Sequence, residues 1–461
     1  MYDRNSLDSI VNYTNLLEGK SLREACGNKI EEHDYKGKGN FGQILEKFYY
    51  GYEPNSNPEP DFEKVGMELK SSPLKILKNG EYRSKERLVL NIINYLEVYK
   101  EEFDGSSFWK KNAHLLLVFY LHDKELDLLD YVIKIADDWK YPKQDLEIIK
   151  QDWEVINKKI KEGKAHELSE GDTFYLGACT KGSTALKSFR DQPFSEEKAK
   201  QRAYSLKQGY VNHIIANLAK DETNVYGKIL QQPDILDKTL SIEKIVVSKF
   251  EPFYGMSASQ IESELGLELN PKAKSYYSLL SNAILGLKLG QKIEEFEKAD
   301  IQVKTIRLNP NNLPKENISF PTFKYKELIE TDWEDSDFKN ILESKFLFVF
   351  YQFSGKDLIL RKVKFWNMKY QDILEAKNVW DEMVSTVLRG EIVREITDKG
   401  VRKTFFPKSR ENRITHVRPH AQNTNDTYQL PIPDRLTGLT KYTKHSFWLN
   451  ASYIRDEIYL K

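Results

Sequence analysis

The sequence predicts an α/β protein made of two tandem domains, each with a mixed central sheet flanked by helices. Two observations support this class. Helical and strand-like segments alternate along the first 218 residues, and the same order of segments returns in the second half. At 461 residues the chain is long enough for two domains that each bury a core.

The first half follows hydrophobic periodicities that separate helices from strands. The run LLLVFY at 115–120 is apolar throughout, as in a strand buried on both faces. Residues 175–184 (YLGACTKGST) are expected to form a loop. The other expected elements are helices over 6–30, 37–52, 142–165, 195–203 and 211–218, and strand-like segments over 83–95 and 203–210.

Five segments of the first half recur in the same order in the second half, at nearly one separation of more than 200 residues. Duplication explains five matches in register, and so long a period indicates two domains rather than a solenoid. We predict domains at 1–218 and 246–461, joined by a linker at 219–245 that is rich in charges and turn residues. The matched pairs are PDFEKVGMELK with EEFEKADIQVK, LLLVFY with FLFVFY, WEVINKKIKEG with WDEMVSTVLRG, LGACTKG with THVRPHA, and RAYSLKQGY with SFWLNASYI.

Composition limits the possible compartment and partners. The 70 basic and 70 acidic side chains balance, so any surface for nucleic acid must come from local clustering. The two cysteines, Cys26 and Cys179, are far apart, which suits a reducing compartment. The charged N-terminal stretch lacks a signal peptide's apolar run, and no Walker-type glycine loop is present. We therefore expect a cytoplasmic protein without membrane or ATP partners.

The segment PDFEKVGMELKSSP at 60–73 carries the strongest chemical signal. Glu68 and Lys70 alternate with the apolar residues of a strand, so both side chains lie on one face. The turn-rich residues before Asp61 allow its carboxylate to join them. Two converging carboxylates suit Mg²⁺, and a lysine beside the metal can orient a water and offset charge on a phosphate.

The second copy departs from the first at this segment. Glu295 stands at the position of Asp61 and the neutral Gln302 at that of Glu68, whereas Lys304 keeps the lysine. Because an amide is a much poorer metal ligand than a carboxylate, we expect the second site to be weak or inactive. A domain that keeps its fold without its chemistry is expected to be kept for binding, with a duplicate retained only for packing as the alternative.

These residues resemble the PD-(D/E)xK metal-dependent nucleases. GQILEKF (Gly42–Phe48), the Pro60–Asp61 pair and GMELKSSP (Gly66–Pro73) resemble the MutH mismatch-repair endonuclease. The length, the duplication, and the stretches YRSKERLVLNIINY and GKAHELSEG resemble the two-domain GATC-cutting restriction endonucleases of the Sau type. The resemblance implies a type II restriction endonuclease that cuts both strands of 5′-GATC-3′ with Mg²⁺, using an N-terminal catalytic domain and a C-terminal effector domain.

The resemblance also assigns active-site roles. Asp61 and Glu68 would hold the metal, Lys70 would act on the water or the phosphate, and Glu46 would complete the acidic cluster. An ordinary exposed helix glutamate is the alternative interpretation of Glu46. The family has a further lysine before the buried strand, for which Lys111 is the candidate, with Lys110 equally compatible with the spacing.

The family reads bases with an R-P-K loop and with the segment that follows it. The first copy has Cys179, Thr180 and Lys181 there, so the resemblance makes Lys181 the expected contact to guanine O6 and N7. Tyr204 and Lys207 are further candidates for DNA contact, with a sheet-edge tyrosine and a solvated lysine as the alternative. The candidates in the second copy are Arg418, His420 and Trp448.

One intact centre per chain has a consequence for assembly. Cutting both strands of a palindrome needs two centres or sequential nicks, so we expect two chains to meet on DNA containing GATC. A second site bound by the C-terminal domain would favour that meeting. The alternatives are a MutH-like nicking enzyme of DNA repair and a GATC-binding protein that does not cleave.

Overall fold

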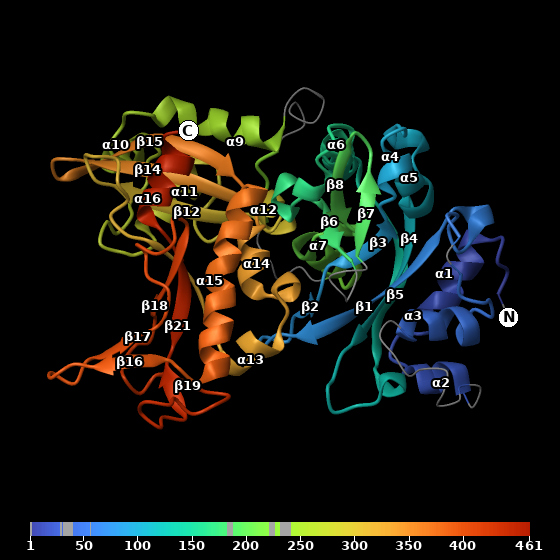
Figure 1. Ribbon diagram of the computed structural model, residues 1–461. Helices are drawn as coiled ribbons and strands as arrows, with labels where there is room; N and C mark the ends of the chain where they lie inside the picture. The colour runs from blue at the N-terminus through green and yellow to red at the C-terminus, as the bar shows by residue number, and fades with distance from the viewer. Residues whose placement is uncertain are drawn as a thin grey trace. The chain divides into compact units, whose positions relative to one another are not determined.

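The computed structural model describes residues 2–27, 30, 40–55, 57–181, 188–220, 226–230 and 241–461. The chain forms two compact units (Figure 1). Unit 1 comprises Met1–Lys238 with Gly290–Asp300, and unit 2 comprises Thr239–Leu289 with Ile301–Lys461. The division after Lys238 falls inside the stretch expected to be a linker. The sequence pattern did not predict that Gly290–Asp300, which lies in the second half of the chain, belongs to unit 1.

Unit 1 contains a four-stranded mixed sheet in the order β2-β1-β4-β5 and a three-stranded antiparallel sheet in the order β3-β9-β6. Strands β1 and β4 run parallel, and the other neighbours in the first sheet are antiparallel. The strands are β1 (Glu68–Ile76), β2 (Tyr82–Ser84), β3 (Leu88–Ile92), β4 (His114–Leu121), β5 (Ile133–Lys140), β6 (Leu176–Thr180), β7 (Phe189–Gln192), β8 (Ser195–Lys200), β9 (Arg202–Leu206), β10 (Tyr226–Gly227) and β11 (Lys292–Ile293). The helices are α1 (Leu7–Asn15), α2 (Leu22–Cys26), α3 (Asn40–Ile44), α4 (Tyr95–Val98), α5 (Ser107–Asn112), α6 (Lys143–Lys161), α7 (Gln208–Leu218) and α12 (Glu294–Lys298).

Unit 2 repeats this plan. A mixed sheet has the order β12-β14-β15 and an antiparallel sheet has the order β13-β21-β18. The strands are β12 (Gln302–Leu308), β13 (Ile318–Phe323), β14 (Phe346–Ser354), β15 (Asp357–Trp366), β16 (Val393–Ile396), β17 (Arg402–Thr404), β18 (Thr415–Pro419), β19 (Thr427–Gln429), β20 (Lys441–Thr443) and β21 (His445–Leu449). The helices are α9 (Ile242–Phe250), α10 (Ala258–Glu264), α11 (Tyr276–Ile284), α13 (Tyr325–Glu330), α14 (Asp337–Leu342), α15 (Tyr370–Arg389) and α16 (Ala451–Tyr453).

Strand register supports the duplication residue by residue. In unit 1 β1 pairs with β4, and in unit 2 β12 pairs with β14, with equivalent residues opposite each other. The antiparallel sheets agree in the same way. The equivalent pairs are Glu68–Leu115 with Gln302–Phe346, Lys70–Leu117 with Lys304–Phe348, Gly177–Ser205 with His416–Trp448, and Cys179–Ala203 with Arg418–Ser446. The fold is therefore α/β, with two nuclease-like units that share one topology.

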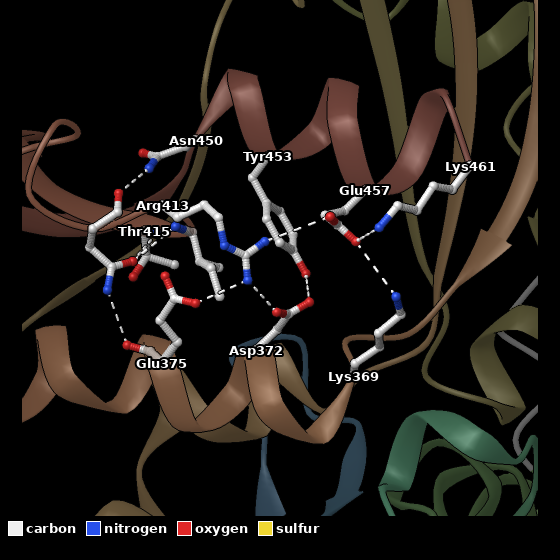
Figure 2. A network of polar contacts seen from close by, with 11 residues as sticks. Lys369, Asp372, Glu375, Arg413, Thr415, Asn450, Tyr453, Glu457 and Lys461 are labelled. Carbon is white, nitrogen blue, oxygen red and sulfur yellow. Dashed lines mark hydrogen bonds and ion pairs between the residues drawn. The ribbon is translucent and has the colours of Figure 1, made fainter.

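The long helix of each unit packs on the antiparallel sheet through its buried face. In α6 that face includes Ile149, Trp153 and Ile156, and the buried Asp152 accepts hydrogen bonds from the N–H groups of residues 174–176 at 2.6–2.9 Å. In unit 2 a polar network links the start of α15 to the segment before β18 and to α16 (Figure 2). Asp372 is at its centre and accepts hydrogen bonds from Arg413 and Tyr453.

Two segments differ from the expectation in type. Residues 176–180, expected in a loop, form the whole of strand β6, and residues 195–200, expected in a helix, form strand β8. The sequence SEEKAK favours a helix locally, but its pairing with β7 in a hairpin overrides that preference. The expected strand at 83–95 covers the end of β2, strand β3 and the start of α4.

The remaining expected elements of the first half are present with shifted ends. The helix predicted at 6–30 is divided into α1 and α2, and the one predicted at 37–52 consists of α3 followed by a π-helical turn, Leu45–Tyr49, with residues 37–39 outside the described part. Strand β4, helix α6 and helix α7 lie where the pattern predicts them. Within the described ranges, no helix combines the length and apolar character needed to span a bilayer.

Candidate functional site

The two carboxylates of the 60–73 segment are fixed by the main chain at the start of β1. Asp61 lies before a 3₁₀ turn, and Gly66, with φ of 65°, lets the chain reverse into the strand. Asp61 Oδ2 accepts a hydrogen bond from the Leu69 N–H at 3.0 Å, and the Asp61 N–H donates to Glu68 Oε2 at 3.1 Å. The seven-residue spacing thus brings both carboxyl groups together.

Two lysines neutralise Glu68, whose side chain is only 3% exposed. Lys70 Nζ lies 2.6 Å from Glu68 Oε1, and Lys111 Nζ lies 3.7 Å from the same oxygen. The Lys111 ammonium also donates to the carbonyls of Asn57 and Glu59 at 2.6 and 3.2 Å. The structure therefore places Lys111, rather than Lys110, at the acidic cluster.

Glu46 faces the same cluster from the π-helical turn. Burial raises the pKa of Glu46, the Glu68 carboxylate raises it further, and Lys70 and Lys111 oppose the shift. Burial, followed by the Glu68 charge, raises the pKa of Asp61 to about 7. These shifts place three carboxyl groups, from two segments of the chain, in one electrostatic environment, where they repel one another and favour a cation.

The donor set fits a divalent metal that relies on its substrate for further ligands. Asp61 and Glu68 offer hard carboxylate oxygens, and Mg²⁺ is commonly held by one or two carboxylates together with waters and substrate phosphates. In the described part of the chain, no group of three or more acidic, histidine or cysteine side chains is close enough to form a metal site. Asp61 and Glu68 are therefore the two candidate ligands, with Glu46 at a greater remove.

Tyr52 is a site residue that the sequence analysis missed. Its N–H donates to the Glu46 carbonyl at 2.9 Å, and its buried hydroxyl has no hydrogen-bond partner in the described residues. Burial raises the pKa of Tyr52 strongly, and the charges of Asp61, Glu46 and Glu68 raise it further. Tyr52 is thus a neutral phenol beside the acidic cluster. Its spacing of six residues from Glu46 is the only sequence signal that could have indicated it.

The second copy has a different arrangement. Both carboxylate oxygens of Glu295 are within 3.1 Å of the Ile229 N–H, and one also accepts from the Leu230 N–H. Gln302 is neutral, and burial lowers the pKa of the equivalent lysine, Lys304. The carboxylate pair that characterises unit 1 is therefore lacking among the described residues at the start of β12.

The expected DNA-contact residues of unit 1 lie in different environments. Lys181 follows β6 and its N–H donates to the Gln201 carbonyl at 2.7 Å; residues 182–187 are outside the described part. Tyr204 is fully buried against Phe108. The Lys207 ammonium is buried and donates to the Thr173 carbonyl at 2.5 Å.

Tyr204 and Lys207 are both buried, whereas the sequence analysis expected them to be available for contact with DNA. Alternation along β9 turns Tyr204 and Leu206 toward α6, where apolar neighbours cover them. Lys207 comes immediately after the strand, and its charge lies near the buried Asp152. Both side chains support the core of unit 1 in this structure.

The three candidates of unit 2 lie together on one face of β18 and β21. The Arg418 guanidinium lies 4.9 Å from the centre of the Trp448 ring, and the His420 ring lies 5.3 Å from it. His420 Nδ1 is 2.9 Å from Ser446 Oγ. Arg418 and His420 are exposed, so this cluster presents a cation and aromatic rings to solvent.

Comparison with known proteins decides the family. The family described as DNA mismatch repair enzyme MutH matches residues 50–152, which include Asp61, Glu68, Lys70 and Lys111. The MutH protein of Vibrio parahaemolyticus is 26% identical over 43% of this chain and 87% of its own length, and that of Shewanella amazonensis is 27% identical over 36% and 72%. The type II restriction enzyme Sau3AI of Staphylococcus aureus is 38% identical over 95% of this chain and 96% of its own length.

The chain belongs to the Sau3AI-type, MutH-like family of restriction enzymes. It is thus a type II restriction endonuclease, a hydrolase that acts on DNA. Membership explains why the similarity to the restriction enzyme extends over both units, whereas the MutH proteins are similar to less than half of the chain.

Proposed function

We propose that the protein makes Mg²⁺-dependent double-strand cuts at 5′-GATC-3′. The observation that carries this proposal is the group formed by Asp61, Glu68 and Lys70, which is held by main-chain hydrogen bonds and a 2.6 Å ion pair. The GATC sequence rests on the resemblance to Sau-type endonucleases and on the lysine at position 181.

Each residue of the cluster has a role in phosphodiester hydrolysis. Bound by Asp61 and Glu68, Mg²⁺ would polarise the scissile phosphate and lower the pKa of the attacking water. Lys70, held by Glu68, positions the water or offsets the charge that develops on the phosphate. Burial and then the Glu68 carboxylate raise the pKa of Asp61 to about 7, so a cation held there would favour the ionised form of Asp61.

We propose that unit 2 binds a second GATC site as an effector without cutting it. Gln302 and the capped carboxylate of Glu295 argue against metal binding there. Arg418, His420 and Trp448 offer hydrogen-bond donors and a flat apolar surface for a DNA groove. Since each chain then has one active centre, two chains would meet on DNA, with 1–218 as catalytic domain, 219–245 as linker and 246–461 as effector domain.

Digestion of a sequenced plasmid tests the central proposal. Incubation with Mg²⁺ should give double-strand breaks whose sequenced ends fall only at GATC, and EDTA should abolish them. Single-strand nicks alone would support the MutH-like repair activity. Binding without cleavage of methylated or unmethylated DNA, with Mg²⁺ or Mn²⁺, would support a non-cleaving GATC-binding protein.

A comparison of one-site and two-site DNA tests the effector role. At matched site concentration, a two-site duplex should be cut faster than a one-site duplex over a range of enzyme concentrations. Equal rates would contradict coupling through unit 2. Arg418→Ala should reduce the two-site advantage and leave cutting of one-site DNA unchanged.

A further inference from the structure

The two copies differ on one face of the antiparallel sheet. In unit 2 this face carries His416, Arg418 and Trp448, whose side chains fill it. At the equivalent register positions unit 1 has the small residues Gly177, Cys179 and Ser205. Unit 1 therefore lacks both the arginine and the large ring of the second copy, although it is the unit with the intact acidic cluster.

An arginine that immediately precedes strand β3 lies beside this face of unit 1. Strand β3 pairs with β9 so that Val89 is opposite Ser205, and Arg87, two residues earlier, belongs to the same face. The Arg87 guanidinium forms an ion pair with Glu170. The Glu170 carboxylate lies only 3.1 Å from the position that a Cβ atom would take on Gly177. The Arg87–Glu170 pair is thus beside the strand on which unit 2 carries Arg418.

Electrostatics around Cys179 agree with this placement. Burial raises the pKa of the Cys179 thiol, and the Glu170 carboxylate raises it further. The positive charges of Arg87 and Lys181 oppose that shift, so both cations lie near Cys179. The position at which the family has arginine is therefore occupied by a thiol that has an arginine and a lysine nearby.

The counterpart of Arg87 in unit 2 is Asn317. Strand β13 pairs with β21 so that Ile318 is opposite Leu449, which corresponds to Leu88 opposite Leu206. Asn317 Oδ1 accepts a hydrogen bond from the Ala451 N–H at 2.7 Å and has a structural role. The two positions are occupied by Cys179 and Arg87 in unit 1, and by Arg418 and Asn317 in unit 2. Each copy thus has one arginine, but at a different one of the two positions.

We propose that Arg87 is a guanine-reading residue of unit 1, held in place by Glu170 and acting together with Lys181. This inference rests on the proposed cleavage at GATC. A guanidinium presents two parallel N–H donors that match O6 and N7 of guanine in the major groove. A GATC duplex offers one guanine on each strand, so Arg87 and Lys181 can each take one.

The geometry suits a base contact. The Arg87 side chain is 32% exposed and that of Glu170 is 15% exposed, so the guanidinium is partly accessible and its carboxylate partner is less exposed. A carboxylate partner fixes the orientation of the guanidinium, which reduces the entropy lost on binding. Because Gly177 has no side chain, Glu170 can lie close against β6. This arrangement makes Glu170 a positioning residue.

Variants of the full-length protein test the assignment. Arg87→Ala should reduce GATC cleavage by about 5- to 150-fold, the range expected for loss of one bidentate base contact. Arg87→Lys, which keeps the charge and loses the fork, should lose a comparable factor. Arg23→Ala is a matched control, because Arg23 is also ion-paired to a carboxylate, that of Asp130 at 2.7 Å, and lies on α2. The control should cut normally.

Duplexes with 7-deazaguanine in one strand separate base reading from phosphate contact. The wild-type protein should cut a given strand more slowly when either guanine lacks N7. Arg87→Ala should be insensitive to one of the two substitutions and still sensitive to the other. Equal sensitivity of variant and wild type to both, or normal cutting by Arg87→Ala, would overturn the inference.

These experiments distinguish failure of the inference about Arg87 from failure of the proposed function. If the wild-type protein does not cut at GATC, the proposed function fails. If the wild type cuts and Arg87→Ala has the properties of the control, only the inference about Arg87 fails. Thermal unfolding of each variant identifies loss of fold, and Arg87→Lys, which can retain the ion pair with Glu170, keeps the test decisive if Arg87→Ala is unstable.

Discussion

Lys298 completes a buried ion pair with Asp145, with its ammonium 3.0 and 3.1 Å from the two carboxylate oxygens. Asp145 is the third residue of α6 and also accepts a hydrogen bond from Tyr210. In unit 2 the third residue of α15, Asp372, accepts from Tyr453 and from Arg413 (Figure 2). The Asp–Tyr pair is thus duplicated. The cation comes from the segment before β18 in unit 2, but from Gly290–Asp300 in unit 1.

We predict that Lys298→Met destabilises unit 1 by about 3–5 kcal/mol, because it leaves the Asp145 charge buried without its cation. The Lys298 and Asp145 side chains are 7% and 4% exposed. The matched control is Lys292→Met, because Lys292 lies in the same segment and forms an exposed ion pair with Glu297. The control should cost no more than about 1 kcal/mol. Denaturant unfolding measures both, and equal effects would contradict the assigned role.

The pH dependence of stability should have a component from two buried histidines. Burial lowers the pKa of His213 and of His445 from 6.5 to about 4. The unfolded chain therefore binds these protons at higher pH than the folded protein does. The contribution to stability is present above about pH 6.5 and is lost as the pH falls toward 4, by up to about 1.4 kcal/mol per pH unit for each group. Urea unfolding between pH 4 and 8 checks this, and His445→Asn should show a shallower loss than the wild type.

The proposed catalytic cluster could be predicted from sequence because its members are local. Asp61, Glu68 and Lys70 lie within ten residues, so strand alternation and one turn suffice to bring them together. The sequence could not distinguish Lys111 from Lys110, because helix α5 is too short for its periodicity to show which lysine faces the cluster. Contacts between distant segments gave no such signal. Glu170 is 83 residues from Arg87, and Lys298 is 153 residues from Asp145.

The burial of Tyr204 and Lys207 was not predicted, for a different reason. Tyr204 and Lys207 are polar-tipped side chains whose apolar parts pack well, and composition alone does not tell an edge tyrosine from a buried one. The alternation with Leu206 was the available signal. It placed Tyr204 on the core face, and the structure agrees with that reading.

Lys70→Ala should separate cleavage from binding. The substitution removes the ammonium that lies 2.6 Å from Glu68, together with its interaction with water or phosphate. We expect the cleavage rate to fall by about 100-fold or more, by analogy with other electrostatic catalytic groups. Binding of a GATC duplex should persist, as measured by fluorescence anisotropy without metal. Normal cutting by this variant would show that the active site is elsewhere.

Tyr52→Phe should lower kcat and raise stability. The Tyr52 hydroxyl is buried without a hydrogen-bond partner in the described residues, so its removal should stabilise the protein by about 1 kcal/mol. The charges of Asp61, Glu46 and Glu68 act on the same hydroxyl, which lies beside the acidic cluster, so its loss should also slow the chemical step by about tenfold. Tyr49→Phe is the control: it removes a satisfied 2.6 Å hydrogen bond to the Tyr13 carbonyl, and should destabilise without slowing the chemistry.

Restoring one acid in unit 2 should not create a second active centre. Gln302→Glu recovers the residue equivalent to Glu68, but the Glu295 carboxylate remains occupied by the N–H groups of Ile229 and Leu230. We therefore expect the double variant Glu68→Gln, Gln302→Glu to be as inactive as Glu68→Gln alone, measured by plasmid cleavage with Mg²⁺ and with Mn²⁺. Cleavage by the double variant would mean that a single carboxylate and Lys304 suffice, and that Asp61 is dispensable in unit 1. The single variant Asp61→Asn then decides whether one carboxylate is enough or both are needed. It should be inactive if unit 1 needs both Asp61 and Glu68.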